Sequence, residues 1–195
     1  SIERIYIARE ISGPFLESLV QQGETVKFNY PNIEEGHIGP FIFEKQAEIA
    51  QAQIDDAVAK GAKLLAGGKL EKLGGGLYLK PTILIDVTPE MDVIAKENFG
   101  PVLPVTIFDN TEDAIAQANA TVFGLSAAVI SGSIDEAEKV ASRLNAGAVS
   151  INDGALTSMI WEAEKSSFGL SGLGASRMGT SGLMRFFRKR VLIRQ

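Results

Sequence analysis

The second half of the chain alternates apolar runs with amphipathic segments, and this alternation constrains the fold more than any other feature. Apolar runs predict strands at residues 102–108, 126–131 and 148–152, and helices are expected between them at 111–120 and 134–144. Runs that are apolar throughout predict strands buried on both faces of a parallel sheet. Each strand–helix–strand unit then needs a right-handed crossover. The sequence therefore predicts an α/β fold with a largely parallel sheet and helices on both faces.

The first half of the chain carries two helix signals. Ser12 can cap a helix that Pro14 opens, because proline in the first turn loses no hydrogen bond, and this helix should end near residue 22. A second helix is expected at 44–60, with Gly61 ending it. Its buried face is expected to carry Ala47, Ala50, Ile54, Ala57 and Val58. The other expected elements are strands at 4–8, 63–66 and 82–85 and a glycine-rich turn region at 67–76.

The composition excludes several classes of protein. A chain of 195 residues with 45% hydrophobic and 22% charged residues can bury a sizeable core and is not disordered. Its apolar runs are far shorter than the roughly 18 residues of a membrane helix, and no leader is visible, so we expect no membrane contact. Cysteine is absent, which excludes disulfides and thiolate metal sites and fits a reducing, cytoplasmic location. The single histidine, His37, lies in a loop-like stretch, so no metal site is expected.

The formal charge of −5 is unevenly distributed. The last part of the chain holds six bases and no acid, namely Arg177, Arg185, Arg188, Lys189, Arg190 and Arg194. Bases mixed with aromatic residues can contact a nucleic acid. The remainder of the chain is acidic, however, unlike a typical nucleic-acid-binding domain. We therefore expect no nucleic-acid partner.

A rigid turn precedes the longest apolar run. Residues 97–101 read Glu-Asn-Phe-Gly-Pro and lead directly into the run 102–108. Taken alone, Glu97 and Phe99 could be a capping acid and a core aromatic. Further motifs along the chain, in order, are Gly39-Pro40 and residues 61–68, 81–84, 87–91, 147–152, 168–169 and 171–174. Together with the turn, they resemble the NAD(P)-dependent aldehyde dehydrogenase family over nearly the whole chain.

This resemblance implies a role for the turn in binding NAD or NADP. In the family, the carboxylate matched by Glu97 accepts hydrogen bonds from the ribose next to the nicotinamide. The ring matched by Phe99 packs near the nicotinamide. Such positioning is the usual contribution of the protein in a cofactor enzyme. This chain alone is not expected to bind the cofactor tightly, since the family's pyrophosphate-binding turn has no match in it.

The resemblance also implies that catalytic parts are absent. The family's nucleophile is a cysteine, which would lie just before Ser1, and the general base and oxyanion donor would lie further upstream. We therefore expect a truncated aldehyde dehydrogenase, which oxidises aldehydes to carboxylic acids when whole and is inactive as this chain, with no catalytic residue of its own. The alternative is a non-catalytic binding or assembly module derived from the family. The sequence upstream of Ser1 would discriminate between the two.

A second implied region is the wall of the aldehyde tunnel. The resemblance assigns Asn152, Trp161 and Phe168 to it, with Met159 nearby. Asn152, Asp153 and Gly154 could instead form a turn in which the Asn and Asp side chains bond the local backbone, and Trp161 and Met159 could equally be core residues. Residues 164–170 depart from the commonest family pattern, which leaves the aldehyde unspecified.

The tail is expected to form an oligomerisation β-segment. By resemblance, residues 1–180 are a catalytic-domain portion and residues 181–195 are the oligomerisation segment. Val191, Leu192 and Ile193 would pair with a neighbouring subunit, giving a homo-oligomer while the bases stay solvated.

Overall fold

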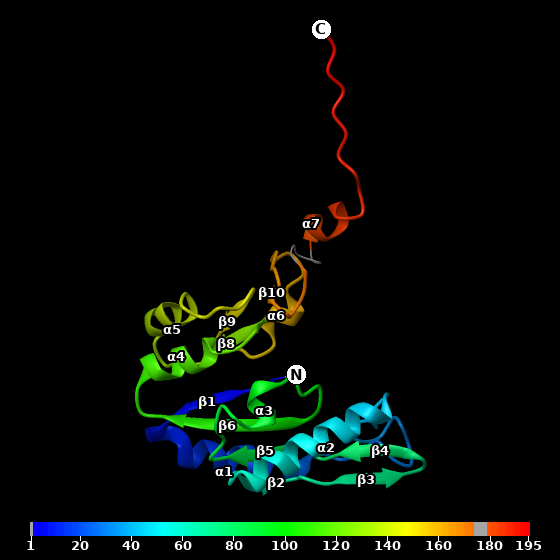
Figure 1. Cartoon of the computed structure of the whole chain (residues 1–195), viewed down its shortest axis with the longest axis vertical. Coiled ribbons are helices and arrows are strands. Elements are labelled where there is room, and N and C mark those ends of the chain that lie inside the picture. Colours follow the sequence, from blue (N-terminus) through cyan, green and yellow to red (C-terminus); the bar gives the residue numbers. More distant parts are fainter. Residues whose placement is uncertain (1, 174–178) are drawn as a thin grey trace. The chain divides into compact units, whose positions relative to one another are not determined.

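The chain folds as two compact units, residues 1–111 and 112–195. The computed structural model describes residues 2–173 and 179–195 (Figure 1). Gly174, at the end of the motif at 171–174, and Arg177 of the basic tail lie outside the described residues. The expected division at residue 180 concerns the assembled enzyme and stays a prediction.

The first unit contains a four-stranded sheet in the order β1-β6-β5-β2. Its strands are β1 (Ile5–Ala8), β6 (Val102–Phe108), β5 (Thr82–Ile85) and β2 (Lys63–Ala66). β6 runs parallel to both neighbours, whereas β2 is antiparallel to β5. The sheet is therefore mixed, with a parallel centre, and the predicted α/β class is confirmed.

Pro104 lies in the middle of β6, where proline is normally disfavoured because it cannot donate to the ladder. β5 pairs with residues 102–104 of β6, and β1 pairs with residues 105–108. Pro104 therefore lies where one partner strand gives way to the other. This position accommodates a residue without an N–H group.

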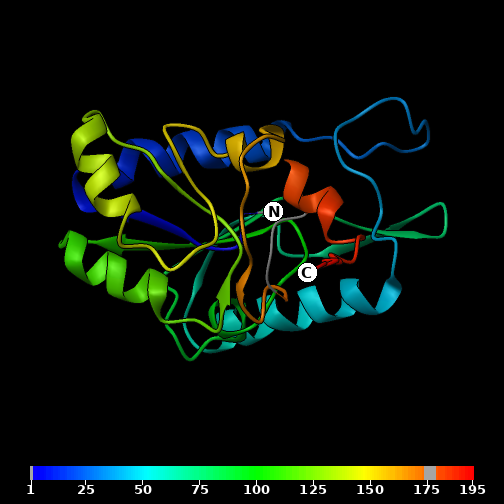
Figure 2. The same ribbon diagram turned by 90° about the horizontal axis from the view of Figure 1, so that it is seen from above.

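Helices cover both faces of this sheet, as the sequence predicts. Figure 2 shows α1 (Arg9–Thr25) and α2 (Glu44–Ala59) on opposite sides of the strands. The alternation along β5 explains this arrangement, since Leu84 packs in the cluster under α2 and Ile83 in the cluster under α1. Two separate apolar clusters thus lie on the two sides of the same strands.

The predicted start of α1 is wrong. The helix begins at Arg9, directly after β1, and Pro14 lies inside it. Ser12 does not cap it; instead its hydroxyl donates to the Arg9 carbonyl oxygen at 2.8 Å. Pro14 is exposed, so water can solvate the carbonyl oxygen that its missing N–H leaves unbonded. The strand therefore continues straight into the helix, and the proline does not mark its beginning.

The buried face of α2 is nearly as predicted. Ala47, Ala50, Ile54 and Ala57 are at most 1% exposed. The prediction that Val58 is buried is wrong, since its side chain is 46% exposed at the edge of the buried face. Gln53 lies within that face and is 3% exposed. Gly61 ends the helix as predicted, with φ of 103° and its N–H bonded to the Val58 carbonyl oxygen at 3.0 Å.

The sequence reading missed two elements of the first unit. The expected turn region at 67–76 contains half of a hairpin, β3 (Leu70–Leu73) paired with β4 (Gly76–Leu79). Gly74 and Gly75 connect the strands at φ of 56° and 88°, which suits a two-residue hairpin turn. A short helix, α3 (Asp92–Ala95), precedes the turn at 97–101.

The second unit alternates helices and strands as predicted. Its elements are α4 (Thr111–Asn119, beginning at the last residue of the first unit), β7 (Phe123–Gly124), β8 (Ala127–Val129), α5 (Ile134–Ala141), β9 (Val149–Ile151), α6 (Leu156–Met159), β10 (Phe168–Gly169) and α7 (Gly179–Met184). β8 and β9 are parallel, and β7 and β10 are antiparallel. Ser133 caps α5, because its hydroxyl oxygen accepts the Glu136 N–H at 3.3 Å.

Gly147 lies beyond the end of α5 and does not cap it. The helix ends at Ala141, and Gly147 instead donates its N–H to the Gly124 carbonyl oxygen at 3.1 Å. A Cβ atom at Gly147 would lie 1.5 Å from the Ser166 carbonyl oxygen. Close backbone approach therefore explains this glycine.

The tail after α7 forms neither helix nor strand at residues 188–195. Val191, Leu192 and Ile193 are 77%, 82% and 89% exposed, so the expected oligomerisation segment pairs with no strand in the part of the chain that the structure describes. Among the described residues, no helix is long and apolar enough to span a membrane. No group of three acidic or histidine residues there is placed to hold a metal ion.

Candidate functional site

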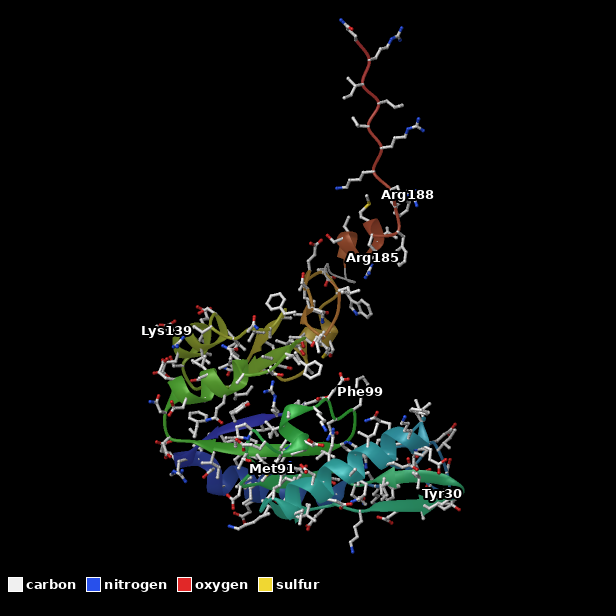
Figure 3. All side chains as sticks on the ribbon, viewed as in Figure 1. Tyr30, Met91, Phe99, Lys139, Arg185 and Arg188 are labelled. Atoms are coloured by element: carbon white, nitrogen blue, oxygen red, sulfur yellow. The ribbon has the colours of Figure 1, made fainter. Side chains whose placement is uncertain are left out.

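The turn at 97–101 joins α3 to β6 and carries the two side chains predicted to hold the nicotinamide riboside. Figure 3 shows Phe99 on this loop. The ring of Phe99 is 67% exposed and Glu97 is exposed, whereas Asn98 between them is fully buried. The alternative that Phe99 is a core aromatic is therefore wrong. The turn presents the carboxylate and the ring and anchors itself through the residue between them.

Two glutamines of α2 hold the carbonyl groups of the turn. Gln53 donates from Nε2 to the Glu97 carbonyl oxygen at 3.1 Å. Gln46 donates from Nε2 to the Asn98 carbonyl oxygen at 2.6 Å. The helix is itself packed against the core, so it provides a firm support for the turn.

The Asn98 side chain closes the turn from inside. Its Nδ2 donates to Gln53 Oε1 at 3.1 Å, and its Oδ1 accepts the Gly100 N–H at 2.8 Å. Glu3 binds from the other side, where its carboxylate accepts the N–H groups of Asn98 at 3.2 Å and Phe99 at 3.4 Å. Successive backbone groups of the turn are thus bonded to two other segments of the first unit, α2 and the N-terminal segment, and to the Asn98 side chain of the turn itself.

Phe99 has a left-handed backbone conformation, with φ of 50°. Such a conformation costs a non-glycine residue roughly 1–3 kcal/mol and persists only where the surroundings enforce it. The bonds to Asn98, Phe99 and Gly100 supply that enforcement. Strain held in this way is typical of functional positions, where side-chain direction matters more than stability.

Charged groups fix α3, the element that leads into the turn. Asp56 of α2 accepts the Asp92 N–H at 2.9 Å and pairs with Lys60 at 2.8 Å. The Asp92 amide, followed by the Lys60 ammonium, holds the pKa of the Asp56 carboxyl below its ordinary value. Asp92 in turn pairs with Lys96, the residue before Glu97, at 2.7 Å. The short helix α3, which leads into the turn, is therefore fixed to the C-terminal end of α2.

The exposed groups fit a nicotinamide riboside. A carboxylate accepts hydrogen bonds at both oxygens and can bind two neighbouring hydroxyl groups of a ribose. Within the described part of the chain, no side chain bonds the Glu97 carboxylate, whereas the carbonyl of the same residue is bonded to Gln53. A mostly exposed ring can pack beside a planar heterocycle. The turn thus presents an acceptor and an aromatic surface from a rigid backbone.

Asn152 follows β9 in the second unit, also with a left-handed φ, of 57°. Its side-chain oxygen accepts the Ser131 N–H at 2.8 Å, which ties the ends of β8 and β9 together. Asp153 bonds the local backbone, with Oδ1 accepting the Ala155 N–H at 2.6 Å. The local-turn alternative is therefore correct for Asp153. Asn152 lies at the carboxyl end of a parallel strand, where ligands of α/β sheets gather.

The aromatic residues assigned to the tunnel wall are exposed. Trp161 is 67% and Met159 65% exposed, so a core role is wrong for both in the described structure. Phe168 is 40% exposed and pairs in β10 with Gly124 of β7. A Cβ atom at Gly124 would lie 2.8 Å from the Phe168 Cβ, so the glycine makes room for this strand. Asn152, Trp161 and Phe168 belong to the second unit, and the nicotinamide residues to the first.

The sequence reading missed the residues that support the turn. They are Glu3, Gln46, Gln53 and Asn98. Gln53 gives the one usable signal, because it lies in the helical arc that otherwise holds small and apolar residues. A polar residue at such a position predicts a buried hydrogen bond, although not its partner.

Comparison with known proteins gives a consistent match. The model of the aldehyde dehydrogenase family matches residues 1–192. A protein of Mycobacterium ulcerans named "Putative succinate-semialdehyde dehydrogenase [NADP(+)] 2" is 36% identical over 98% of this chain and 37% of its own length. Benzaldehyde dehydrogenase [NAD(+)] of Pseudomonas putida is 37% identical over 77% of this chain and 30% of its own length. The matched part of the chain thus spans about a third of the length of these relatives.

Solved structures agree with the sequence matches. A structure described as "Putative Aldehyde Dehydrogenase PutA" from Anabaena variabilis is 52% identical, with a TM-score of 0.94 over 97% of this chain and 41% of that one. Betaine aldehyde dehydrogenase of Staphylococcus aureus, solved with NAD+, is 30% identical, with a TM-score of 0.85 over 94% of this chain and 37% of that one.

Proposed function

Because the chain belongs to the aldehyde dehydrogenase family, we propose that it is the C-terminal portion of an NAD(P)-dependent aldehyde dehydrogenase. In this proposal the portion begins just after the nucleophilic cysteine, and the whole enzyme oxidises an aldehyde to a carboxylic acid. The chain supplies the residues that hold the nicotinamide riboside and one wall of the aldehyde tunnel. By itself it is inactive.

The turn at 97–101 is the observation that carries this proposal. Its backbone is bonded on both sides, and it presents Glu97 and Phe99 outward. The nicotinamide, when bound, accepts a hydride from the substrate. Glu97 fixes the adjoining ribose and Phe99 packs beside the ring, so that the accepting face has one orientation. Positioning of this kind lowers the barrier without any covalent role for the two residues.

The path of the N-terminal segment supports the expected place of the nucleophile. Glu3 lies two residues before β1 and bonds the Asn98 and Phe99 amides. The chain that leads into β1 is therefore held against the same turn that presents Glu97 and Phe99. A nucleophile a few residues upstream would emerge near the nicotinamide, as hydride transfer from a bound aldehyde requires.

The substrate side of the proposal rests on the second unit. Asn152, Trp161 and Phe168 would form the tunnel wall, with Asn152 held by its bond to Ser131 and the two aromatic side chains exposed. Relatives are named for both NAD+ and NADP+ and for different aldehydes, so the proposal covers either cofactor and an aldehyde as the substrate class. A cytoplasmic location stays a prediction.

A direct experiment compares the chain with the whole enzyme. Residues 1–195 alone should give no aldehyde-dependent reduction of NAD or NADP above a protein-free blank, because nucleophile, base and pyrophosphate site are expected elsewhere. The whole enzyme should reduce the cofactor in the same assay. Steady cofactor reduction by the chain alone would contradict the proposal.

A second candidate function is a non-catalytic assembly module. The exposed apolar side chains of Val191, Leu192 and Ile193 favour it, since a segment of this kind can pair with a strand of another chain. The two functions are compatible in a homo-oligomeric enzyme. They differ for the chain alone, where the module predicts association with a full-length partner.

A further inference from the structure

Two buried side-chain amides lie directly behind the turn. Gln53 is 3% exposed and Asn98 is fully buried. A buried amide is costly unless its groups are hydrogen-bonded. Here the Gln53 Nε2 donates to the Glu97 carbonyl oxygen at 3.1 Å, its Oε1 accepts from Asn98 Nδ2 at 3.1 Å, and Asn98 Oδ1 accepts the Gly100 N–H at 2.8 Å. The amides thus form one connected network.

This network fixes the residues on both sides of Phe99. Gln53 holds Glu97 directly and holds Gly100 through the Asn98 side chain. Phe99 lies between these fixed points with φ of 50°. Neither amide is accessible to a ligand, because both side chains are buried. The network can therefore act on a bound cofactor only by setting where Glu97 and Phe99 point.

We propose that Gln53 is a positioning residue for the nicotinamide riboside. It touches neither cofactor nor substrate and sets the directions of Glu97 and Phe99 through its bonds to the turn. This inference rests on the proposed function of the turn. The position of Gln53 supports it, since the other residues of the buried arc are apolar and an apolar side chain would fill the same space without directing the turn.

Gln51 provides a matched control on the same helix. Its Nε2 donates to the Gly68 carbonyl oxygen at 3.0 Å, and its Oε1 accepts the Leu70 N–H at 2.9 Å. Like Gln53, it bonds one carbonyl group and one N–H donor from a distant segment. Its partners are Gly68, between β2 and β3, and Leu70, the first residue of β3, so neither belongs to the turn. Loss of Gln51 should therefore affect stability in a similar way without affecting the turn.

The first test follows amide hydrogen exchange in the cofactor-free chain by NMR. Gln53→Met should speed exchange at Gly100 and Asn98 by about fivefold or more, because the bonds that hold the turn are lost. Gln51→Met should speed exchange at Leu70 and leave Gly100 unchanged. Unchanged exchange at Gly100 in Gln53→Met overturns the inference, whatever the chain does in catalysis.

The second test uses the whole enzyme, in the present numbering. Gln53→Met should lower the single-turnover rate of hydride transfer by about tenfold, with the cofactor Kd changed less than about threefold, because misdirection acts on the transition state more than on binding. Gln51→Met should leave the transfer rate within about twofold of wild type. Equal losses of transfer rate in the two variants would show that Gln53 is only structural.

Asn98→Ser serves if Gln53→Met does not fold. This substitution removes the Nδ2 group that donates to Gln53 Oε1 and keeps an oxygen near Gly100. The transfer rate should therefore again fall more than the cofactor affinity, but by less than in Gln53→Met. An unchanged transfer rate in Asn98→Ser contradicts the inference. Glu97→Gln separates the two proposals. An unchanged transfer rate in Glu97→Gln contradicts the proposed function itself. A lowered rate in Glu97→Gln, together with a normal rate in Gln53→Met, contradicts only the positioning role of Gln53.

Discussion

Phe99 should reverse the usual order of alanine and glycine in stability. At φ of 50°, a residue with a Cβ atom bears strain of about 1–2 kcal/mol, which glycine does not bear. Glycine gains more entropy on unfolding, which costs about 0.5–1 kcal/mol. The net expectation is that Phe99→Gly is more stable than Phe99→Ala by about 0.5–1 kcal/mol.

Loss of the ring does not disturb this comparison. Both variants lose the same mostly exposed aromatic side chain, so the loss cancels between them. Glu48, an exposed residue inside α2, is the control, because there glycine should be less stable than alanine by about 1 kcal/mol. The assay is urea denaturation followed by circular dichroism, with equal m values required of each pair.

A Phe99→Gly variant that is no more stable than Phe99→Ala, with the control pair in the expected order, would contradict this prediction. That result would mean that the left-handed backbone at Phe99 is not strained. The expected result would instead show that the turn keeps an unfavourable backbone for the sake of where the ring lies. In the whole enzyme, both variants should lose hydride-transfer rate, so the more stable protein is not the more active one.

Three further predictions concern the fold, acid sensitivity and assembly. The Ile54 side chain is 1% exposed, so Ile54→Ala should lower the free energy of unfolding by about 2–5 kcal/mol. The Val58 side chain is 46% exposed, so Val58→Ala should lower it by less than about 1 kcal/mol. Equal losses of stability in urea denaturation would contradict the burial of Ile54. The pKa of the Asp56 carboxyl is lowered from 3.8, chiefly by the hydrogen bond from the Asp92 amide. The stability that the ionised carboxylate contributes is therefore fully present above pH 3.8 and is lost as the pH falls through the lower folded-state pKa. Asp56→Asn should therefore be less stable than wild type near neutral pH, with the difference shrinking in acid; a difference that is the same at both pH values excludes this role. The chain should form a dimer in light scattering that removal of the residues after Phe187 abolishes, with repulsion between the tail bases fading as salt rises; a monomer throughout, or a dimer that survives the deletion, shows that the tail is not the interface.

The elements that the sequence predicts are those in which local signals agree with the packing. The run at 102–108 and the segments that follow it are apolar or amphipathic at the period that the fold uses, so β6, α4, α5 and β9 lie close to their expected bounds. The start of α1 was wrongly predicted from Pro14, because the usual place of proline at a helix start is only a preference. An exposed position inside α1 tolerates it, and exposure was not readable from the sequence.

The candidate site likewise has a part that the sequence predicts and a part that it does not. Glu97 and Phe99 stand in a recognisable motif, and both are exposed on the turn in the structure. Their support could not be predicted, because Gln53 meets Asn98 across 45 positions of sequence and Glu3 meets it across 95. Such contacts depend on how α2 and the N-terminal segment pack in the folded unit. The buried arc of α2 shows that Gln53 needs a partner, but not which one.

We propose that Glu97 fixes the nicotinamide ribose, and the single-turnover rate of the whole enzyme measures this role. Glu97→Gln replaces charge-assisted hydrogen bonds by weaker neutral ones, a loss of about 1–2 kcal/mol, or roughly tenfold in rate. Glu48→Gln is the control for loss of one exposed negative charge. We expect hydride transfer to be slowed about tenfold in Glu97→Gln, with the cofactor Kd changed less than about threefold and the control variant unaffected. A single-turnover rate unchanged from wild type would contradict it.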